Sequence, residues 1–299
     1  MRAVILSGSG RTADPWHSYA ETSAELAAIA REAGFDVEIV LGPVEGFADL
    51  ADDVRVVIVN AGDPDGPLPD DAPDPGAPAG ALVTRAAARF DAALERGIGL
   101  LAVHSAAATL RELPAFGTAL GARWIAGQSW HPPIGEASVH LVGRHLIREG
   151  LDDFTVLDEC YTGLPLTGVI EPIAEHEEDG IRHPLVWARE LGRSRLVYSA
   201  LGHDVRSYAS AEHRELLHRA LRWLREVPAP STPGAVGAPT RSDAAGGPGA
   251  SGAARGPDPS GGAGGPAAPG TVDAPDARGG APEASDRPTS RPDPRGTDA

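Results

Sequence analysis

Residues 98–106 read Ile-Gly-Leu-Leu-Ala-Val-His-Ser-Ala, an apolar run that ends abruptly in two polar residues. Such a run is typical of a strand covered by helices on both faces of its sheet. We expect Ile98–Val103 to form this strand and Ala106–Arg111 to form a helix directly after it. His104 and Ser105 would then lie at a strand tip and a helix N-terminus, where backbone N–H groups favour negative charge. This is the geometry of a nucleophile elbow, with His in the place of Cys or Ser.

Strands and helices alternate on both sides of this segment. The helix patterns begin at Ser18, where Glu21 completes a capping box, at Leu82, and near Ser210; Gly34 and Gly97 end the first two. The other expected strands are Ala3–Leu6, Phe35–Leu41, Val54–Val59, Ala137–Val142, Phe154–Leu157, Val169–His176, Leu185–Ala188 and Arg195–Ala200. The alternation predicts an α/β fold, a three-layer α/β/α sandwich with a mostly parallel central sheet and ligands at the carboxyl ends of the strands.

The composition changes abruptly near Val227. From Pro228 to Ala299 the chain has no aromatic residue, Leu, Ile or His and consists mainly of Pro, Gly, Ala and small polar residues. Ordering a residue costs about 1–2 kcal/mol of backbone entropy, which a segment with almost nothing to bury cannot recover. We therefore expect one folded domain over residues 1–227 and a disordered Pro/Gly/Ala-rich tail over residues 228–299.

Charge, apolar patterning and cysteine usage limit the partners and the cellular compartment that we expect. The formal net charge is −16, and an acidic domain repels phosphate backbones, so no nucleic-acid partner is expected. No apolar run approaches the ~20 residues of a membrane-spanning helix, and no signal peptide is evident at the N-terminus. The single cysteine, Cys160, cannot form an internal disulfide, which fits a reducing compartment. We expect a cytoplasmic protein without a membrane partner.

Two polar stretches fall at the ends of the first and last expected strands. Gly8 and Gly10 would let backbone N–H groups approach a ligand, with His17 nearby; the alternative is a tight turn that only leads into the helix. His203 and Asp204 follow the last strand, so His203 should face the same crevice as His104. We expect the apolar strand Ile98–Val103 to lie centrally in the sheet with Arg195–Ala200 as its near neighbour, which brings both histidines to the same side. Rings within ~8 Å of one another around a polar pocket would support a shared substrate or metal.

Other candidates lie on loops. Trp130 and His131 precede two prolines that make the loop rigid, and together they offer a stacking face and a polar tip for a sugar; the alternative is an ordinary surface loop. Glu159 is a candidate general acid or base, or else an exposed turn carboxylate. Likewise, His104 could be a packed histidine and Ser105 an N-cap. Local spacing shows no zinc motif, although a divalent metal such as zinc at His104, His131 and His203 stays open.

Several short motifs, taken in their order along residues 2–226, resemble the ThuA-like family, which is named for trehalose utilisation. They are Leu6-Ser7-Gly8-Ser9-Gly10 with Trp16-His17, Val59-Asn60-Ala61-Gly62, Leu101-Ala102-Val103-His104-Ser105-Ala106, Trp130-His131-Pro132-Pro133, Asp158-Glu159-Cys160-Tyr161, His183-Pro184-Leu185-Val186-Trp187 and Leu201-Gly202-His203-Asp204. The resemblance implies a class I glutamine amidotransferase-like fold. In amidotransferases the elbow residue is the nucleophilic Cys and a late His is its base; here these positions fall on His104 and His203. Cys160 lies elsewhere in the sequence, so glutaminase activity is not expected.

The resemblance also implies a role in carbohydrate use, in particular of oxidised disaccharides. Our leading hypothesis is a cytoplasmic enzyme that acts on a disaccharide, glucoside or keto-sugar by acid–base chemistry at His104, His203 and Glu159. Gly8, Gly10, His17, Ser105, Trp130, His131 and Asp204 would bind the substrate. The alternative is a non-catalytic carbohydrate-binding or regulatory protein on the same fold. No nicotinamide or flavin motif is evident, and whether copies of the chain form a homo-oligomer stays open.

Overall fold

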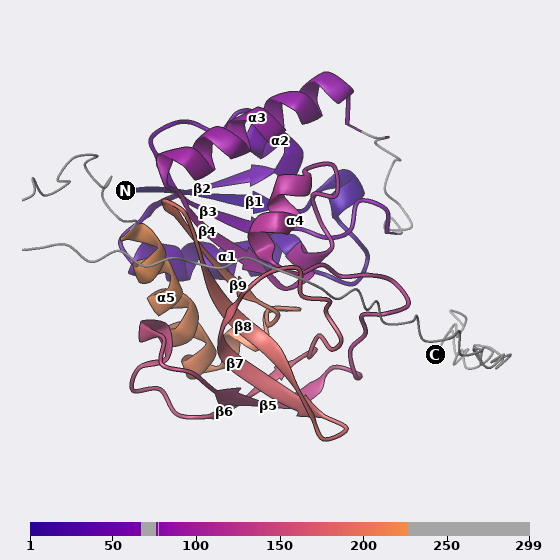
Figure 1. Cartoon of the computed structure of the whole chain (residues 1–299), viewed down its shortest axis with the longest axis vertical. Helices are drawn as coiled ribbons and strands as arrows, with labels where there is room; N and C mark the ends of the chain where they lie inside the picture. Colours follow the sequence, from indigo (N-terminus) through magenta and orange to yellow (C-terminus); the bar gives the residue numbers. More distant parts are fainter. Residues whose placement is uncertain (67–75, 77, 227–299) are drawn as a thin grey trace, which may run out of the picture. The chain divides into compact units, whose positions relative to one another are not determined.

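The computed structural model describes residues 1–66, 76 and 78–226 (Figure 1). The strands are β1 (Arg2–Ser7), β2 (Asp36–Leu41), β3 (Val54–Asn60), β4 (Gly99–Val103), β5 (Gly135–Leu141), β6 (Phe154–Asp158), β7 (Glu171–Glu178), β8 (Ile181–Leu191) and β9 (Ser194–Ser199). The helices are α1 (Tyr19–Glu32), α2 (Pro43–Ala48), α3 (Gly80–Arg96), α4 (Pro114–Leu120) and α5 (Ala211–Arg225). The described residues also form four short 3-10 helices, which are η1 (Gly10–Thr12), η2 (His104–Ala107), η3 (Leu146–Arg148) and η4 (Ser207–Ala209). The tail predicted for residues 228–299 lies outside the described residues, so it stays a prediction.

The described strands form one sheet in the order β2-β1-β3-β4-β9-β8-β7-β5-β6. Strands β2, β1, β3, β4 and β9 pair in parallel, and β4 lies between β3 and β9, as predicted for the apolar run. The remaining pairs, from β9 through β8, β7 and β5 to β6, are antiparallel.

The sheet is therefore mixed, and the prediction of a mostly parallel sheet was wrong. Only two residues, Asp179 and Gly180, separate β7 from β8, and only Gly192 and Arg193 separate β8 from β9. Connections this short cannot cross over to a parallel neighbour. Both residues of the first turn have positive φ, 51° and 74°, which matches the twist of a two-residue hairpin.

Helices cover both faces of the parallel half of the sheet (Figure 1). Helices α1 and α5 contact each other and the strands on one face, and α2, α3 and α4 pack on the other. All of β4 is buried, which explains its uninterrupted apolar sequence. Helix α5 begins after Ser210, whose side chain accepts a hydrogen bond from the backbone of His213, and it buries the predicted stripe that ends at Leu224.

Two local predictions were wrong. No α-helix follows β4 directly; the chain forms the four-residue η2 and reaches α4 only at Pro114. His104 and Ser105 therefore do not lie at the N-terminus of an α-helix. Ser18 precedes α1 as expected, but its carbonyl oxygen, rather than its hydroxyl, accepts the hydrogen bonds from Glu21 and Thr22, so the predicted capping box does not form. None of the helices in the described ranges is long and apolar enough to cross a membrane.

Candidate active site

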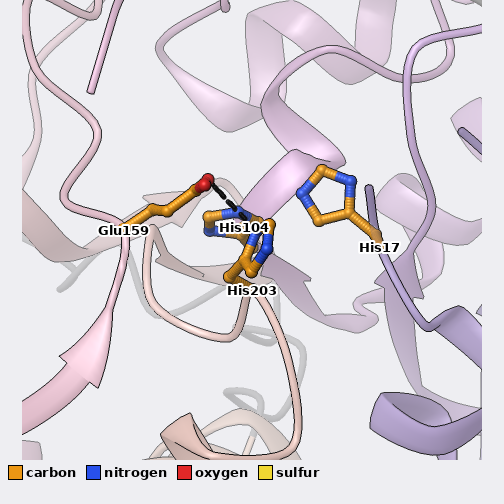
Figure 2. A group of neighbouring side chains, drawn as sticks. All are labelled: His17, His104, Glu159 and His203. Atoms are coloured by element: carbon orange, nitrogen blue, oxygen red, sulfur yellow. Dashed lines mark ion pairs between the residues drawn. The ribbon is translucent and has the colours of Figure 1, made fainter. Parts of the chain in front are cut away.

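Three histidines and a glutamate meet at the carboxyl ends of the parallel strands (Figure 2). His104 follows β4, His203 follows the neighbouring β9, and His17 lies in the loop before α1. The ring centroids of His104 and His203 are 5.3 Å apart, which confirms the predicted juxtaposition. The His17 centroid is 5.0 Å from that of His104 and 4.7 Å from that of His203. Together with Glu159, which follows β6, we call these residues the histidine–glutamate cluster.

Glu159 points its carboxylate at the imidazoles of the cluster (Figure 2). One carboxylate oxygen, Oε2, lies 3.1 Å from His203 Nδ1 and 3.6 Å from His104 Nε2. The same oxygen is 3.6 Å from Nε2 of His131. These are ion-pair distances, but neither His104 Nε2 nor His203 Nδ1 is aligned for a hydrogen bond to it. The carboxylate is therefore surrounded by imidazole nitrogens rather than bound by any one of them.

His104 is fixed by contacts on the side away from Glu159. Its Nδ1 lies 2.6 Å from the carbonyl oxygen of Ala200, and its own carbonyl oxygen accepts a hydrogen bond from the Tyr198 hydroxyl at 2.9 Å. Because a carbonyl oxygen can only accept, Nδ1 carries the proton and Nε2 faces the cluster. The residue has a φ of +47°, a strained backbone conformation for a side chain of this size.

His17 is held in the same way by Asp14, a buried carboxylate. Asp14 Oδ1 lies 2.6 Å from His17 Nδ1 and also accepts the backbone N–H of Trp16 and His17. Its other oxygen accepts the Tyr19 hydroxyl at 2.7 Å, and that hydroxyl lies 3.0 Å from the Ser105 hydroxyl. The network fixes the His17 ring with Nε2 pointing away from Asp14.

Asp158 joins the two remaining members of the cluster. Its carboxylate is buried and accepts the backbone N–H groups of Glu159 at 2.8 Å, Gly202 at 2.7 Å and His203 at 3.1 Å. It also accepts the hydroxyl of Ser207 at 2.5 Å. One side chain thus sets the distance between the loop after β6 and the loop after β9.

The electrostatics of the cluster favour an ionised Glu159. Burial opposes its ionisation, but the neighbouring imidazoles of His104 and His203 outweigh burial, so its pKa lies well below the usual range. Burial disfavours the charged form of His203, but Glu159 outweighs this and raises the pKa of His203. His17 differs: burial lowers its pKa despite the contact with Asp14.

A cavity of about 520 Å³ opens above the cluster. His17, Glu159 and His203 line it, together with the predicted residues Ser105 and His131. Its aromatic walls come from Trp16, Trp124 and Tyr161. His104 does not line the cavity; it lies beneath the floor and is 1% exposed. The volume suits a small ligand, and the indole faces suit the apolar faces of a sugar ring.

Four of the residues predicted to bind a substrate lie outside this cavity. The backbone N–H of Gly8 is bound to the carbonyl oxygen of Asn60, and Gly10 lines a separate cavity. Trp130 is 44% exposed and pairs through its backbone with Thr162. The carboxylate of Asp204 binds Arg206.

Sequence reasoning did not select Asp14, Asp158, Trp16, Trp124 or Tyr161 as site residues. The two aspartates act through loops, where no periodicity marks a functional side chain. The available signal was proximity: Asp14 and Trp16 lie within three residues of His17, and Asp158 and Tyr161 lie within two residues of Glu159. Trp124 had no such neighbour.

Cys160 lies apart from the cavity of the cluster. The side chain is buried, and burial, aided by the nearby charge of Asp158, raises the pKa of the thiol to about 12. A thiol with so high a pKa is a poor nucleophile at neutral pH.

Comparisons with known proteins agree with this fold. Residues 2–224 match the profile of the ThuA family, described as trehalose utilisation, and the chain belongs to this family. No curated protein gives a significant match.

Similar solved structures include a ThuA-like protein of Parabacteroides merdae, with a TM-score of 0.60, 18% identity, and coverage of 75% of this chain and 90% of that one. Another is a ThuA-like protein of Bacteroides uniformis, with a TM-score of 0.57, 17% identity, and coverage of 75% and 91%. A cytoplasmic protein of Salmonella typhimurium has a TM-score of 0.50, 12% identity, and coverage of 75% and 99%. At these identities the likeness shows the fold alone.

Proposed function

We propose that this protein is a cytoplasmic enzyme that transfers protons within a disaccharide, glucoside or keto-sugar. The observation that carries the proposal is the set of titratable side chains on the floor of an aromatic-lined cavity. Membership of the trehalose-utilisation family supports a role in carbohydrate metabolism. Imidazoles exchange protons near neutral pH, which suits isomerisation, enolisation or elimination beside a carbonyl group.

The chemistry needs no oxidant or reductant. A base removes the proton from the hydroxyl-bearing carbon beside the sugar carbonyl, the C–H electron pair forms the C=C bond, and the carbonyl electron pair moves to oxygen to give an enediolate. An acid protonates that oxygen to give the enediol. Loss of the other hydroxyl proton to a base and protonation of the former carbonyl carbon then give the isomer. Glu159, His203 and His131 line the cavity and can reach a substrate. Because His104 is sealed beneath the floor, we assign it a positioning role rather than direct contact with the sugar.

The test is incubation of the full chain with a 3-keto-disaccharide in D2O, followed by NMR. An enzyme of this type incorporates deuterium beside the carbonyl or forms an isomer. Glu159→Gln should slow the exchange by at least ~100-fold, the scale of one acid–base group. His218→Ala is the matched control and should leave the exchange unchanged, because His218 lies on α5, pairs with Glu215 and does not line the cavity.

A carbohydrate-binding or regulatory protein would give a different result. The sugar would raise the melting temperature of the wild type, and no deuterium would enter the sugar at any protein concentration. That outcome would refute the proposed enzymatic function.

A further inference from the structure

We propose that the histidine–glutamate cluster binds a divalent metal ion, with zinc as the ion that its ligands fit best. The inference rests on the proposed function, because the ion would lie on the floor of the same cavity. It is a different ligand set from the one that the sequence left open, since His17 and Glu159 belong to it and His131 does not.

The spacing of the ligand atoms supports a metal. Each cluster member offers one nitrogen or oxygen, and all of these atoms lie within 4.8 Å of one another. Ligands of a tetrahedral zinc ion, at bond lengths of ~2.0–2.2 Å, lie ~3.4 Å apart. The contacts of Glu159 Oε2 with His203 and His104, at 3.1 and 3.6 Å, already have this spacing. Side-chain shifts of about 1 Å would complete the geometry.

Unpaired nitrogen atoms are the second observation. His17 Nε2, His104 Nε2 and His203 Nδ1 are buried, and none of them has a hydrogen-bond partner among the described residues. A buried polar atom without a hydrogen-bond partner destabilises the fold. Two of them, His104 Nε2 and His203 Nδ1, lie 3.6 and 3.1 Å from Glu159 Oε2, and all of the ligand atoms lie within 4.8 Å of one another. A metal ion bound among them would give all three nitrogen atoms a partner.

The proton positions on two of these rings are those of metal ligands. The Ala200 carbonyl and the Asp14 carboxylate accept the Nδ1 protons of His104 and His17, each at 2.6 Å. Each ring therefore presents an Nε2 lone pair to the cluster. A metal-ligating histidine usually donates its other N–H to a carboxylate or a backbone carbonyl, which fixes the ring and raises its basicity.

A metal here defines how a sugar would bind. Of its ligands, His17, Glu159 and His203 line the cavity, so the ion can reach a carbonyl or hydroxyl oxygen of the substrate. It would polarise that oxygen as a Lewis acid. His131, which lines the same cavity, would then carry the proton.

The experiment measures metal binding directly. The full chain is stripped with a chelator, dialysed, and titrated with Co²⁺ and with Zn²⁺. Elemental analysis gives the stoichiometry, and Co²⁺ absorption reports the coordination geometry. We expect one ion per chain, a tetrahedral or five-coordinate Co²⁺ spectrum, and a higher melting temperature with Zn²⁺.

Variants identify the ligands. Glu159→Gln and His17→Ala should weaken binding at least ~100-fold, and Asp14→Asn, which keeps its shape, ~10–100-fold. His218→Ala should bind like the wild type, and circular dichroism verifies that each variant is folded. Less than a tenth of an ion per folded wild-type chain at saturation would overturn the proposal. Tight binding by folded Glu159→Gln and His17→Ala would also overturn it.

Turnover separates this inference from the proposed function. Deuterium exchange in the keto-sugar is measured on the stripped and on the loaded protein. Exchange that is lost on stripping and restored by the ion supports both proposals. Metal binding without exchange refutes the proposed function alone, whereas full exchange by a chain that binds no metal refutes the metal site alone.

Discussion

Replacing Asp158 with Asn should destabilise the protein by about 3 kcal/mol. Each oxygen of this buried carboxylate accepts two hydrogen bonds. Oδ1 accepts the backbone N–H groups of Glu159 and His203, and Oδ2 accepts the backbone N–H of Gly202 and the hydroxyl of Ser207. The amide group of Asn must turn an NH2 towards one of these pairs. The Ser207 hydroxyl can rotate to accept a hydrogen bond, but at least one buried backbone N–H loses its acceptor, which costs about 1–3 kcal/mol. Loss of the charge weakens the remaining hydrogen bonds.

Thermal unfolding followed by circular dichroism measures this effect. For a domain of this size, 1 kcal/mol corresponds to ~2–4 °C, so the melting temperature should fall by ~6–12 °C. Asp152→Asn is the matched control, because Asp152 is exposed, and it should change the stability by less than ~0.5 kcal/mol. An Asp158→Asn variant that melts within 2 °C of the wild type, a threshold set at about the effect of 1 kcal/mol, would refute the role given to this carboxylate.

The remaining predictions concern pH, the thiol and the tail. Burial lowers the pKa of His176 from ~6.5 to about 4, so its contribution to stability is complete above pH ~6.5 and is lost as the pH falls towards 4. The free energy of unfolding in urea should therefore be about 2 kcal/mol higher at pH 7.5 than at pH 5 because of this group. His176→Gln should reduce that difference. No ammonia should be released from glutamine, as measured by a coupled assay; release that survives Cys160→Ala would instead indicate a serine nucleophile. Truncation after Val227 should change the melting temperature little, and a loss of several degrees would show that the tail packs on the domain.

The sequence predicted the half of the fold in which apolar runs are followed by helices. The run at Ile98–Val103 could be placed centrally because only a strand covered on both faces is apolar throughout. The antiparallel half was expected as strands, but their direction depends on the connections. The dipeptide Asp179-Gly180 is typical of a two-residue hairpin turn, and it would have predicted that the strands on either side of it are antiparallel. Helix α2 was not expected, because its six residues are too few for a helical period to emerge.

The site was predictable where it depends on strand ends and unpredictable where it depends on loops. His104 and His203 follow adjacent strands, so the alternation of elements was enough to bring them together. The approach of Glu159 and His17 depends on the paths of two loops, which Asp158 and Asp14 hold through backbone N–H groups. Such side-chain-to-backbone bonds have no sequence period, and they become visible only when the chain is folded.

The turn at His104, directly after β4, lies where a nucleophile elbow would place its nucleophile, but here it positions an imidazole ring. A nucleophile elbow presents its side chain above backbone N–H groups at a helix N-terminus, but here η2 is a single short turn. The backbone at His104 keeps a positive φ, which costs about 1–3 kcal/mol. Hydrogen bonds to Tyr198 and Ala200, worth about 1 kcal/mol each, offset that cost. The strained tip therefore supplies a fixed imidazole nitrogen to the cluster, which is the requirement of a metal ligand rather than of a nucleophile.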